Sequence, residues 1–314
     1  MTLTELRYLV ALADQRHFGR AAETCHVSQP TLSTQIRKLE EYLGVALFER
    51  GSRSVVPTPI GERIIAEARA VLAGTLRLRD IASTAHAVLT GPLRLGIIPT
   101  LSPYLLPWLL APLRSEHPGL DFHLTEDLTA NLLRLLLDYE LDAALVALPV
   151  EAADIETRPL FDEPFLLACP AGHPLTQQTG IRLEDLDAAE LMLLTEGHCL
   201  RDQAIALCGQ PSIDPAFRTA SLTTLRHLVA GGYGCTLLPA LAAAAETDAR
   251  ISLIPLADAA AHRRIGLIWR RGSPREADFT ALAALVRRCA PAQVNVIPAG
   301  SFATDGQRQA GSPR

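Results

Sequence analysis

The first sixty residues place apolar side chains at helical spacing in three successive stretches. Thr2 and Glu5 form a capping-box pattern ahead of the first stretch, and a second short helix fits residues 19–25. Ser28 is a suitable N-cap for a third helix, and a turn at 51–52 precedes a β-prone stretch at 54–56. The third helix carries its apolar face on Leu32, Ile36, Leu39 and Leu43. This order of helix, helix, turn, helix and hairpin predicts a winged helix-turn-helix over residues 1–57.

A long linker helix is predicted next, over residues 58–89. Thr58 is suited to its N-cap and Pro59 to its first position. Its apolar stripe consists of Ile60, Ile64, Ala68, Val71, Leu72, Leu76 and Ile81. The small N-terminal head cannot cover so long a stripe, so we expect a partner helix from a second subunit. Packing of the helix onto its own C-terminal domain is the alternative.

From residue 90 to about 298 the pattern alternates between short buried strands and helices. Strands are predicted at 93–98, 121–125, 142–148, 165–168, 191–194, 235–238 and 265–269, and helices at 103–113, 131–139, 222–230 and 277–288. Such alternation favours parallel strands joined by crossover helices, with ligands at the carboxyl ends of the strands. We therefore expect a two-lobed α/β regulatory domain over 90–298, with lobe I at about 90–162 and 268–298 and lobe II at about 163–267. The polar tail, 299–314, is expected to be disordered.

Composition narrows the protein class. Apolar residues make up 48 % of the 314, and none of their runs approaches the roughly 20 residues of a membrane span. The N-terminus lacks the basic and apolar regions of a secretory signal, which favours the cytoplasm and reduced thiols. The six cysteines include no C-x-x-C pair and no repeated metal-ligand spacing. We therefore expect neither a disulfide framework, nor a metal, nor another cofactor.

Charge and side-chain chemistry favour DNA as the partner of the N-terminal head. The net charge is −5, but residues 1–60 carry seven Arg or Lys against six Asp or Glu. The third helix presents Gln29, which can bond adenine, and Thr31, whose methyl can contact thymine. Its neighbours Pro30 and Ser33 complete the predicted base-reading surface, and Arg50 and Arg53 of the hairpin are suited to phosphates. An ordinary solvated helix face is the alternative, and the three-helix-plus-hairpin order disfavours it.

Two cysteines stand out from the others. Cys169 and Cys289 lie in apolar stretches typical of core positions. Cys199 instead follows Gly197 and His198 and opens a short helix predicted to reach about residue 207. A thiol at a helix N-terminus, beside His198 and near Arg201, is expected to have a lowered pKa and a reactive thiolate. Peroxide chemistry requires such a thiolate.

Cys208 lies nine residues beyond Cys199. In one continuous helix their Cα atoms would be about 13.5 Å apart along the axis and about 180° apart around it. A disulfide needs Cα atoms within about 7 Å, so the helix and the disulfide exclude each other. Oxidation of a redox pair here would have to refold the segment. The residues alone leave two interpretations, a redox pair or two unrelated cysteines.

Four motifs of the head resemble the LysR-type transcriptional regulators. They are Phe18-Gly19-Arg20-Ala21-Ala22, Val27-Ser28-Gln29-Pro30-Thr31-Leu32-Ser33, Ile36-Arg37-Lys38-Leu39-Glu40 and Leu47-Phe48-Glu49-Arg50. The resemblance implies a dimer formed through the linker helix. It also implies an effector domain with the two-lobed fold of periplasmic binding proteins, in agreement with the pattern of residues 90–298.

Further motifs resemble the hydrogen-peroxide-responsive members of that family. They are Gly197 to Ala204 with Cys208 downstream, and the segments 96–100, 103–107, 160–164 and 220–226. The resemblance implies that Cys199 is the peroxidatic cysteine and Cys208 the resolving one. It also implies a peroxide pocket lined by Thr100, Thr129, His198 and Arg270. Cys235 matches no cysteine with a role in that family and is expected to be a core residue.

The leading hypothesis is therefore a redox-switched regulator of oxidative-stress genes, and not an enzyme. Its implied partners are operator DNA, RNA polymerase, hydrogen peroxide, a reductant such as glutaredoxin or thioredoxin, and three further copies of the chain in a homotetramer. A second hypothesis keeps the DNA-binding head but places a small-molecule effector in the cleft between the lobes. A third, a thiol peroxidase with a DNA anchor, would turn over peroxide continuously with thioredoxin.

Overall fold

The computed structural model describes residues 1–49, 55–83, 87–178, 180–186, 191–208, 219–245 and 247–298. The chain divides into two compact units, 1–85 and 86–314. Among the described helices, none is both long enough and apolar enough to cross a membrane. The predicted tail, 299–314, lies outside the described residues.

Three short helices form the N-terminal head: α1 (Leu3–Gln15), α2 (Phe18–Thr24) and α3 (Gln29–Leu43). The capping box is present, since the Thr2 hydroxyl accepts from the Glu5 N–H and the Glu5 carboxylate accepts from the Thr2 N–H. Ser28 caps α3 through its hydroxyl, as predicted. The apolar faces of the three helices meet in one core. The helix order predicted from the sequence is thus confirmed.

The base of the predicted hairpin follows α3. Phe48 and Pro57 form an antiparallel bridge, and the Glu49 N–H donates to the Val56 carbonyl at 2.8 Å. Residues 50–54, which include the predicted DNA contacts Arg50 and Arg53, lie outside the described residues.

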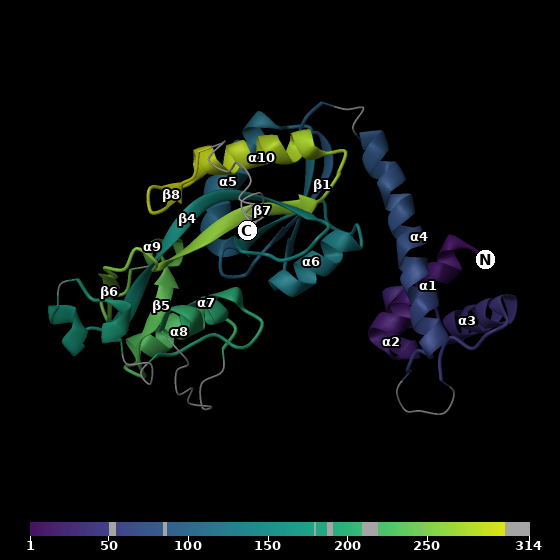
Figure 1. Cartoon of the computed structure of the whole chain (residues 1–314), viewed down its shortest axis with the longest axis horizontal. Coiled ribbons are helices and arrows are strands. Elements are labelled where there is room, and N and C mark those ends of the chain that lie inside the picture. The colour runs from purple at the N-terminus through teal and green to yellow at the C-terminus, as the bar shows by residue number, and fades with distance from the viewer. Residues whose placement is uncertain are drawn as a thin grey trace, which may run out of the picture. The chain divides into compact units, whose positions relative to one another are not determined.

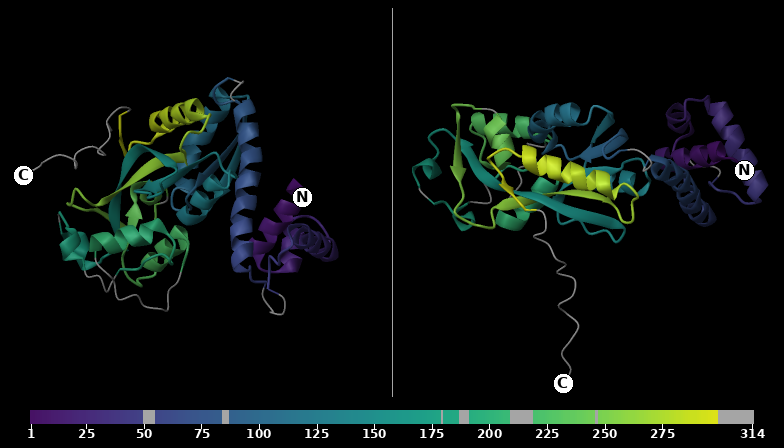
Figure 2. Two further views of the ribbon diagram at one scale, coloured as in Figure 1. Left: turned by 45° about the vertical axis from the view of Figure 1, so that its right-hand side comes forward. Right: turned by 90° about the horizontal axis from the view of Figure 1, so that it is seen from above.

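The linker helix α4 (Pro59–Ser83) begins where the sequence predicted and is described to residue 83. The Thr58 hydroxyl accepts from the Gly61 N–H at 2.9 Å and donates to the Ala46 carbonyl at 2.8 Å. This double contact fixes the start of α4 against the head. The helices α1 to α3 gather at the N-terminal part of α4, and its C-terminal part extends beyond them (Figures 1 and 2).

The apolar stripe of α4 divides into two faces. Ile65 and Ala68 are buried in the core of the head, with Leu72 packed against it. Val71, Leu78 and Ile81 are exposed, by 47 %, 69 % and 58 % respectively. At 100° per residue these three lie within about 80° of one another around the helix. The second face therefore takes no part in the core of the head.

The described part of the second unit contains one eight-stranded sheet, in the order β2-β1-β3-β7-β4-β5, with β6 and β8 also paired to β4. Its strands are β1 (Gly91–Ile97), β2 (Leu120–Glu126), β3 (Ala143–Leu148), β4 (Ile155–Pro170), β5 (Thr236–Pro239), β6 (Ile251–Pro255), β7 (His262–Arg270) and β8 (Asn295–Val296). Its helices are α5 (Ser102–Glu116), α6 (Thr129–Leu137), η1 (Pro174–Gln177), η2 (Leu183–Asp185), α7 (Cys199–Cys208), α8 (Leu222–Ala230), α9 (Ala240–Ala245) and α10 (Glu276–Cys289).

The long strands β4 and β7 pair with each other and link two lobes (Figure 1). Lobe I has the larger core, built on β1, β3, α5 and α10. Lobe II has two smaller clusters, on either side of the sheet formed by β4, β5 and β6. The two-lobed α/β fold is as predicted.

The expectation of parallel sheets is correct only for lobe I, where β1 pairs in parallel with β2 and β3. The pairings of β7 with β3 and of β4 with β5, β6 and β7 are antiparallel. The reason is that β4 and β7 carry the chain between the lobes in opposite directions. The predicted strand at 191–194 is also wrong: Leu191 makes a single bridge with Cys235, and the segment continues irregularly.

The start of α4 yields a stability test. In a helix, Gly→Ala ordinarily stabilises by about 1 kcal/mol. A Cβ at Gly61, however, would lie 2.1 Å from the Leu47 carbonyl oxygen, a backbone atom that cannot move aside. We therefore expect Gly61→Ala to destabilise the head by about 1–3 kcal/mol. Hydrogen exchange of the amides in α1 to α3 measures this, and Gly119→Ala, whose Cβ would meet only Thr90 at 3.5 Å, is the control. Unchanged exchange in Gly61→Ala would contradict the packing described.

Candidate functional site

The two cysteines singled out in the sequence lie at opposite ends of α7, which begins at Cys199 and ends at Cys208. The ideal helical rise separates their Cα atoms by about 13.5 Å. All six cysteines belong to the described part of the chain and are present as thiols. The structure therefore shows the helical state that excludes a disulfide between these two residues.

The two thiols of α7 also pack against different cores. Cys199 packs against the apolar core of lobe I, although the helix that begins with it belongs to lobe II. Cys208 packs against the lobe II cluster that contains Leu191 and Leu237. The intervening residues Leu200 and Ala204 are buried in lobe II. Helix α7 thus connects the two lobes through its first residue.

The two threonines of the predicted pocket follow neighbouring strands at their carboxyl ends. Thr100 follows β1, and Thr129 begins α6 immediately after β2. Because β1 and β2 are parallel neighbours, both threonines lie at the same edge of the sheet, where ligands of α/β proteins bind. The Thr129 Oγ1 is buried and, among the described residues, has no hydrogen-bond partner of normal geometry. Its hydroxyl nevertheless lies close enough to the Cys199 sulfur to lower the pKa of that thiol.

A buried ion pair supports this edge. Arg263 on β7 and Glu163 on β4 are direct register partners, and both side chains are fully buried. The guanidinium donates from Nε to the Glu163 Oε2 at 2.8 Å, and from Nη1 and Nη2 to the Thr100 Oγ1 and carbonyl at 2.8 and 3.0 Å. The Glu163 Oε1 accepts from the Leu241 N–H at the start of α9 at 2.9 Å. Arg263 therefore fixes the position of Thr100.

The prediction of a lowered pKa for Cys199 is wrong. Desolvation by the surrounding protein raises the pKa of the Cys199 thiol above its ordinary value of 9.0 and is the largest effect. The positive charge of Arg263, the Leu200 N–H and the Thr129 hydroxyl each lower it, and Asp202 raises it. Sequence proximity could not reveal how deeply the thiol is buried. At neutral pH the reduced residue is therefore mainly protonated.

The two neighbours expected to activate Cys199 act differently. His198 is buried, and desolvation lowers the pKa of its imidazole, so the ring is neutral at pH 7. The Arg201 guanidinium donates to the Leu194 carbonyl at 3.1 Å and holds the loop before α7. The cation that lowers the Cys199 pKa is Arg263.

The structure does not bring Arg270 to this group. Its guanidinium donates to the carbonyls of Leu136 at 2.6 Å and Leu141 at 2.5 Å and stacks over the Tyr139 ring at 4.0 Å. These contacts lie around the C-terminal end of α6, about 10 Å along that helix from Thr129. Arg263, seven residues earlier on β7, occupies the position near Cys199 that the sequence assigned to Arg270.

Arg263 and Glu163 were not among the residues predicted from the sequence, although their positions in it carry a signal. Strand residues alternate between two faces. Arg263 has the same parity as the buried Ile265 and Leu267, and Glu163 the same parity as Phe161 and Phe165. Opposite charges at inward positions of two strands indicate a buried ion pair once the strands are known to be partners.

The predicted base-reading surface is accessible on α3. Gln29, Pro30 and Thr31 are exposed, and Ser33 is half-buried. The Thr31 and Ser28 hydroxyls lie 2.8 Å apart and bond each other. Arg37 and Lys38, also exposed, add positive charge to the same helix. The first turn of α3 therefore presents short polar side chains with cations nearby, as groove recognition requires.

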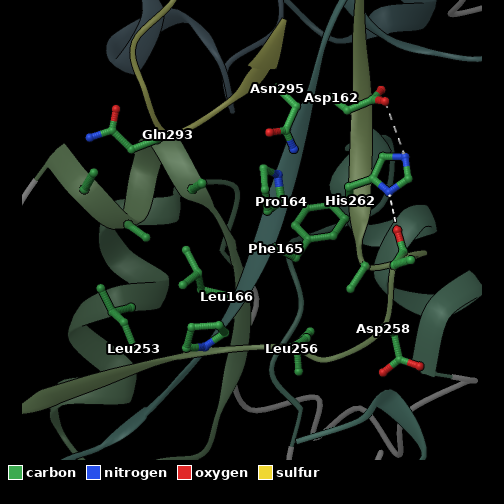
Figure 3. Close-up of a pocket in the computed structure, with 16 residues that line it drawn as sticks. Asp162, Pro164, Phe165, Leu166, Leu253, Leu256, Asp258, His262, Gln293 and Asn295 are labelled. Carbon is green, nitrogen blue, oxygen red and sulfur yellow. Dashed lines mark hydrogen bonds and ion pairs between the residues drawn. The ribbon is translucent and has the colours of Figure 1, made fainter. Parts of the chain in front are cut away.

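Two pockets of the second unit lie apart from the thiols. One, of about 580 Å³, lies between the lobes and is lined by Leu148, Thr157, Gln203, Leu207 and Arg263 among others. The second, of about 630 Å³, opens beside β4, where His262 and Asp162 lie 3.9 Å apart above apolar walls that include Phe165, Leu253 and Leu256 (Figure 3). Neither contains Cys199 or Cys208.

Family comparisons match nearly the whole chain. The family described as "Bacterial regulatory helix-turn-helix protein, lysR family" matches residues 3–62. The family described as "LysR substrate binding domain" matches residues 86–290. The two matches cover the head with the start of α4, and nearly all of the second unit.

Individual proteins agree with this assignment. The chain is 44 % identical over 290 residues, 91 % of this chain and 95 % of the relative, to the Escherichia coli DNA-binding transcriptional dual regulator OxyR. A full-length OxyR mutant from Pseudomonas aeruginosa superposes with a TM-score of 0.71 at 42 % identity, covering 92 % of this chain and 96 % of that one. A Corynebacterium glutamicum OxyR mutant with hydrogen peroxide bound superposes with a TM-score of 0.62 at 40 % identity, covering 92 % of each chain.

The Thr129 hydroxyl provides a test of the Cys199 environment. We expect Thr129→Val to raise the pKa of the Cys199 thiol further, because the substitution removes a hydrogen-bonding group that favours the thiolate. Loss of a hydrogen bond to a charged group corresponds to a change of about one pKa unit. We therefore expect the thiolate fraction, and with it the rate of alkylation at pH 7, to fall about tenfold. Both proteins should react faster as the pH rises towards the thiol pKa.

Stability should not change with this substitution, because the buried hydroxyl has no other partner of normal geometry among the described residues. Thr125→Val on β2 is the control, since Thr125 is also half-buried and is not among the groups that shift the Cys199 pKa. Equal alkylation rates for Thr129→Val and the unmodified protein would show that Thr129 does not act on the thiol.

Proposed function

Because this chain belongs to the LysR family of transcriptional regulators, we propose that it regulates oxidative-stress genes as a DNA-binding sensor of hydrogen peroxide. In this proposal the switch is oxidation of Cys199 followed by disulfide formation with Cys208. The observation that carries it is α7, which holds these two thiols at opposite ends and against different cores.

The chemistry at Cys199 balances with one peroxide and no other reactant. The Cys199 thiolate attacks one peroxide oxygen, so that an S–O bond forms and the O–O bond breaks. The departing hydroxide takes a proton and leaves as water, and Cys199 becomes a sulfenic acid. The Cys208 thiolate then attacks the Cys199 sulfur, the S–S bond forms, and the sulfenic oxygen leaves as a second water. Two thiols and one peroxide thus give one disulfide and two waters.

The surrounding residues are suited to orient the peroxide. The Thr129 hydroxyl can bond a peroxide oxygen, since it has no other partner of normal geometry among the described residues. Thr100 is held by Arg263, whose charge also favours the thiolate. Neutral His198 can accept a proton from the peroxide or donate one to the leaving oxygen. Arg263 replaces Arg270 in the predicted pocket.

The disulfide requires the two ends of α7 to meet, which breaks the helix. Cys199 must leave the core of lobe I, or Cys208 must leave the cluster of lobe II, or both. Either movement changes how α7 joins the two lobes. This is a two-state element, because a helical and a disulfide-bonded segment cannot coexist. The signal therefore originates as a change in how the lobes pack.

Dimer formation would bring two DNA-binding heads together. The exposed face of α4, with Val71, Leu78 and Ile81, is suited to pack on the same helix of a second copy. The head carries little net charge, so one head alone should bind DNA weakly. Two heads on one dimer bind far more tightly, through their effective concentration.

A second uncovered apolar surface is suited to join dimers into the proposed tetramer. The strand β2 is an edge of the sheet, and its Leu124 is exposed by 41 %. Helix α5 exposes Trp108 and Leu110, by 52 % and 43 %. Exposed aromatic and aliphatic side chains are enriched at protein interfaces. We place the whole assembly in the cytoplasm, where promoter DNA and RNA polymerase are present and glutaredoxin or thioredoxin can reduce the disulfide.

The cleft between the lobes favours a second candidate function, a regulator that binds a small-molecule effector. Its volume of about 580 Å³ is in the range of ligand sites. Gln203 of α7 lines it, and the Gln203 Oε1 is buried with no hydrogen-bond partner among the described residues. The double variant Cys199→Ser/Cys208→Ser separates the two functions. It should lose the response to peroxide, whereas an effector-switched regulator would keep its response.

Disulfide mapping tests the redox switch. One equivalent of peroxide should produce a Cys199–Cys208 linkage in the full chain, detected by mass spectrometry of non-reduced peptides. In Cys208→Ser the sulfenic acid on Cys199 should persist and be trapped by a sulfenic-acid-specific nucleophile, because the resolving thiol is absent. Cys289→Ser, at the C-terminal end of α10, should behave as the unmodified protein. Absence of the Cys199–Cys208 linkage in the unmodified protein would refute the mechanism.

The recognition helix can be tested separately. We expect Gln29→Ala to weaken binding to an operator found by footprinting by about 1–3 kcal/mol per contact, while binding to random DNA is unchanged. Fluorescence anisotropy at fixed salt measures both. Tyr42→Ala, near the other end of α3 and exposed by 68 %, is the control. Equal losses on operator and random DNA would show that Gln29 contacts the backbone and does not read bases.

A further inference from the structure

Three potential metal ligands meet in lobe II, where two of them belong to the apolar cluster against which Cys208 also packs. They are the sulfur atoms of Cys169 and Cys235 and a ring nitrogen of His173, and all lie within 4.8 Å of one another. Both cysteines are buried, with exposed fractions of 0 % and 3 %, and the histidine is half-buried. The redox switch proposed above makes no use of these residues.

The fold brings the three residues together by strand register and one tight turn. In the antiparallel β4–β5 pairing Ala168 opposes Thr236, so Cys169 and Cys235 are the next residues to face each other. The chain then reverses after Pro170, and the His173 N–H donates to the Pro170 carbonyl at 3.1 Å. Gly172 adopts a φ of 86°, the left-handed conformation that such a turn requires at its third residue. The turn thus returns His173 towards the cysteine pair.

This donor set has a definite chemical preference. Two thiolates and an imidazole are soft to intermediate ligands, which favour Zn²⁺ or Cu⁺ over Mg²⁺ or Ca²⁺. Metal–sulfur bonds of about 2.3 Å and metal–nitrogen bonds of about 2.0 Å place such ligand atoms about 3.5–4 Å apart. Ligand atoms within 4.8 Å of one another need to approach by at most about 0.8–1.3 Å to reach these distances. Three ligands satisfy Cu⁺, and Zn²⁺ would add a water on the side of the half-buried histidine.

We propose that Cys169, His173 and Cys235 form a binding site for a thiophilic d¹⁰ cation, Zn²⁺ or Cu⁺. Binding replaces two S–H bonds by two metal–sulfur bonds and releases two protons, while the neutral imidazole contributes its lone pair. No electron transfer is involved. Cys199 and Cys208 cannot together bind one such ion in this state, because α7 holds them about 13.5 Å apart.

The test uses the full chain, reduced with a phosphine and freed of metal under anaerobic conditions. Zn²⁺ and Cu⁺ are titrated in separate arms, each against a chromophoric chelator of its own. We expect one equivalent to bind per chain in at least one arm, with release of about two protons and protection of Cys169 and Cys235 from alkylation. Strong binding in one arm alone identifies the cation.

Variants locate the site. The double variant Cys199→Ser/Cys208→Ser should still bind one metal ion per chain, and so should Cys289→Ser. His173→Asn should weaken binding by more than about 100-fold. Asparagine retains an acceptor for the Leu175 N–H, which His173 now caps through Nδ1 at 3.3 Å, so this variant should remain folded.

Three outcomes would overturn the proposal. The first is that neither the Zn²⁺ titration nor the Cu⁺ titration shows one ion bound per chain. The second is binding that survives unchanged in His173→Asn and Cys235→Ser. The third is loss of binding in the double sensor variant, which would assign the metal to Cys199 and Cys208. The redox switch is tested by a separate linkage assay, so either inference can fail alone.

Discussion

The ion pair between Arg263 and Glu163 is the interaction on which the architecture of the second unit depends. It joins β4 and β7 where they pass from one lobe to the other, and both charges are removed from water. Such burial is tolerated because each group has further hydrogen bonds: Arg263 also bonds Thr100, and Glu163 also bonds the first turn of α9. Loss of one partner from a pair of this kind costs about 3–5 kcal/mol. The same arginine lowers the pKa of Cys199, so the structural pair also shapes the sensor chemistry.

Burial of Cys199 has two opposing consequences for a thiol sensor. It raises the pKa of the thiol, which lowers the fraction of thiolate available to react. It also places the sulfur against the core of lobe I, so that chemistry at one atom changes a contact between lobes. A fully exposed cysteine would be more readily ionised, but its oxidation would disturb little packing. The Arg263 charge, the Leu200 N–H and the Thr129 hydroxyl partly offset the effect of burial.

In the head and α4, helix caps and helical spacing of apolar residues largely determine the structure. Caps at Thr2, Ser28 and Thr58 set where three helices begin. The apolar stripe of α4 is wider than the head can cover, and the head leaves its outer face exposed. The helical spacing of apolar residues thus determines both the orientation of α3 and the exposed face of α4 that is suited to a second subunit.

The sequence alone determined the features that depend on neighbours a few residues apart: the helix starts, the helical face of α3, and the distance along α7 that separates Cys199 from Cys208. Family resemblance extended these to a redox role for the two thiols. Tertiary structure decided what depends on strand register and burial. It placed Arg263 beside Cys199 and Arg270 at the far end of α6. It raised the Cys199 pKa that sequence proximity predicted to fall, and it brought Cys169 and Cys235 together across 66 positions of sequence. The spacing of residues in the sequence determines their positions along and around a helix. Desolvation and the pairing of distant strands, in contrast, exist only once the chain has folded.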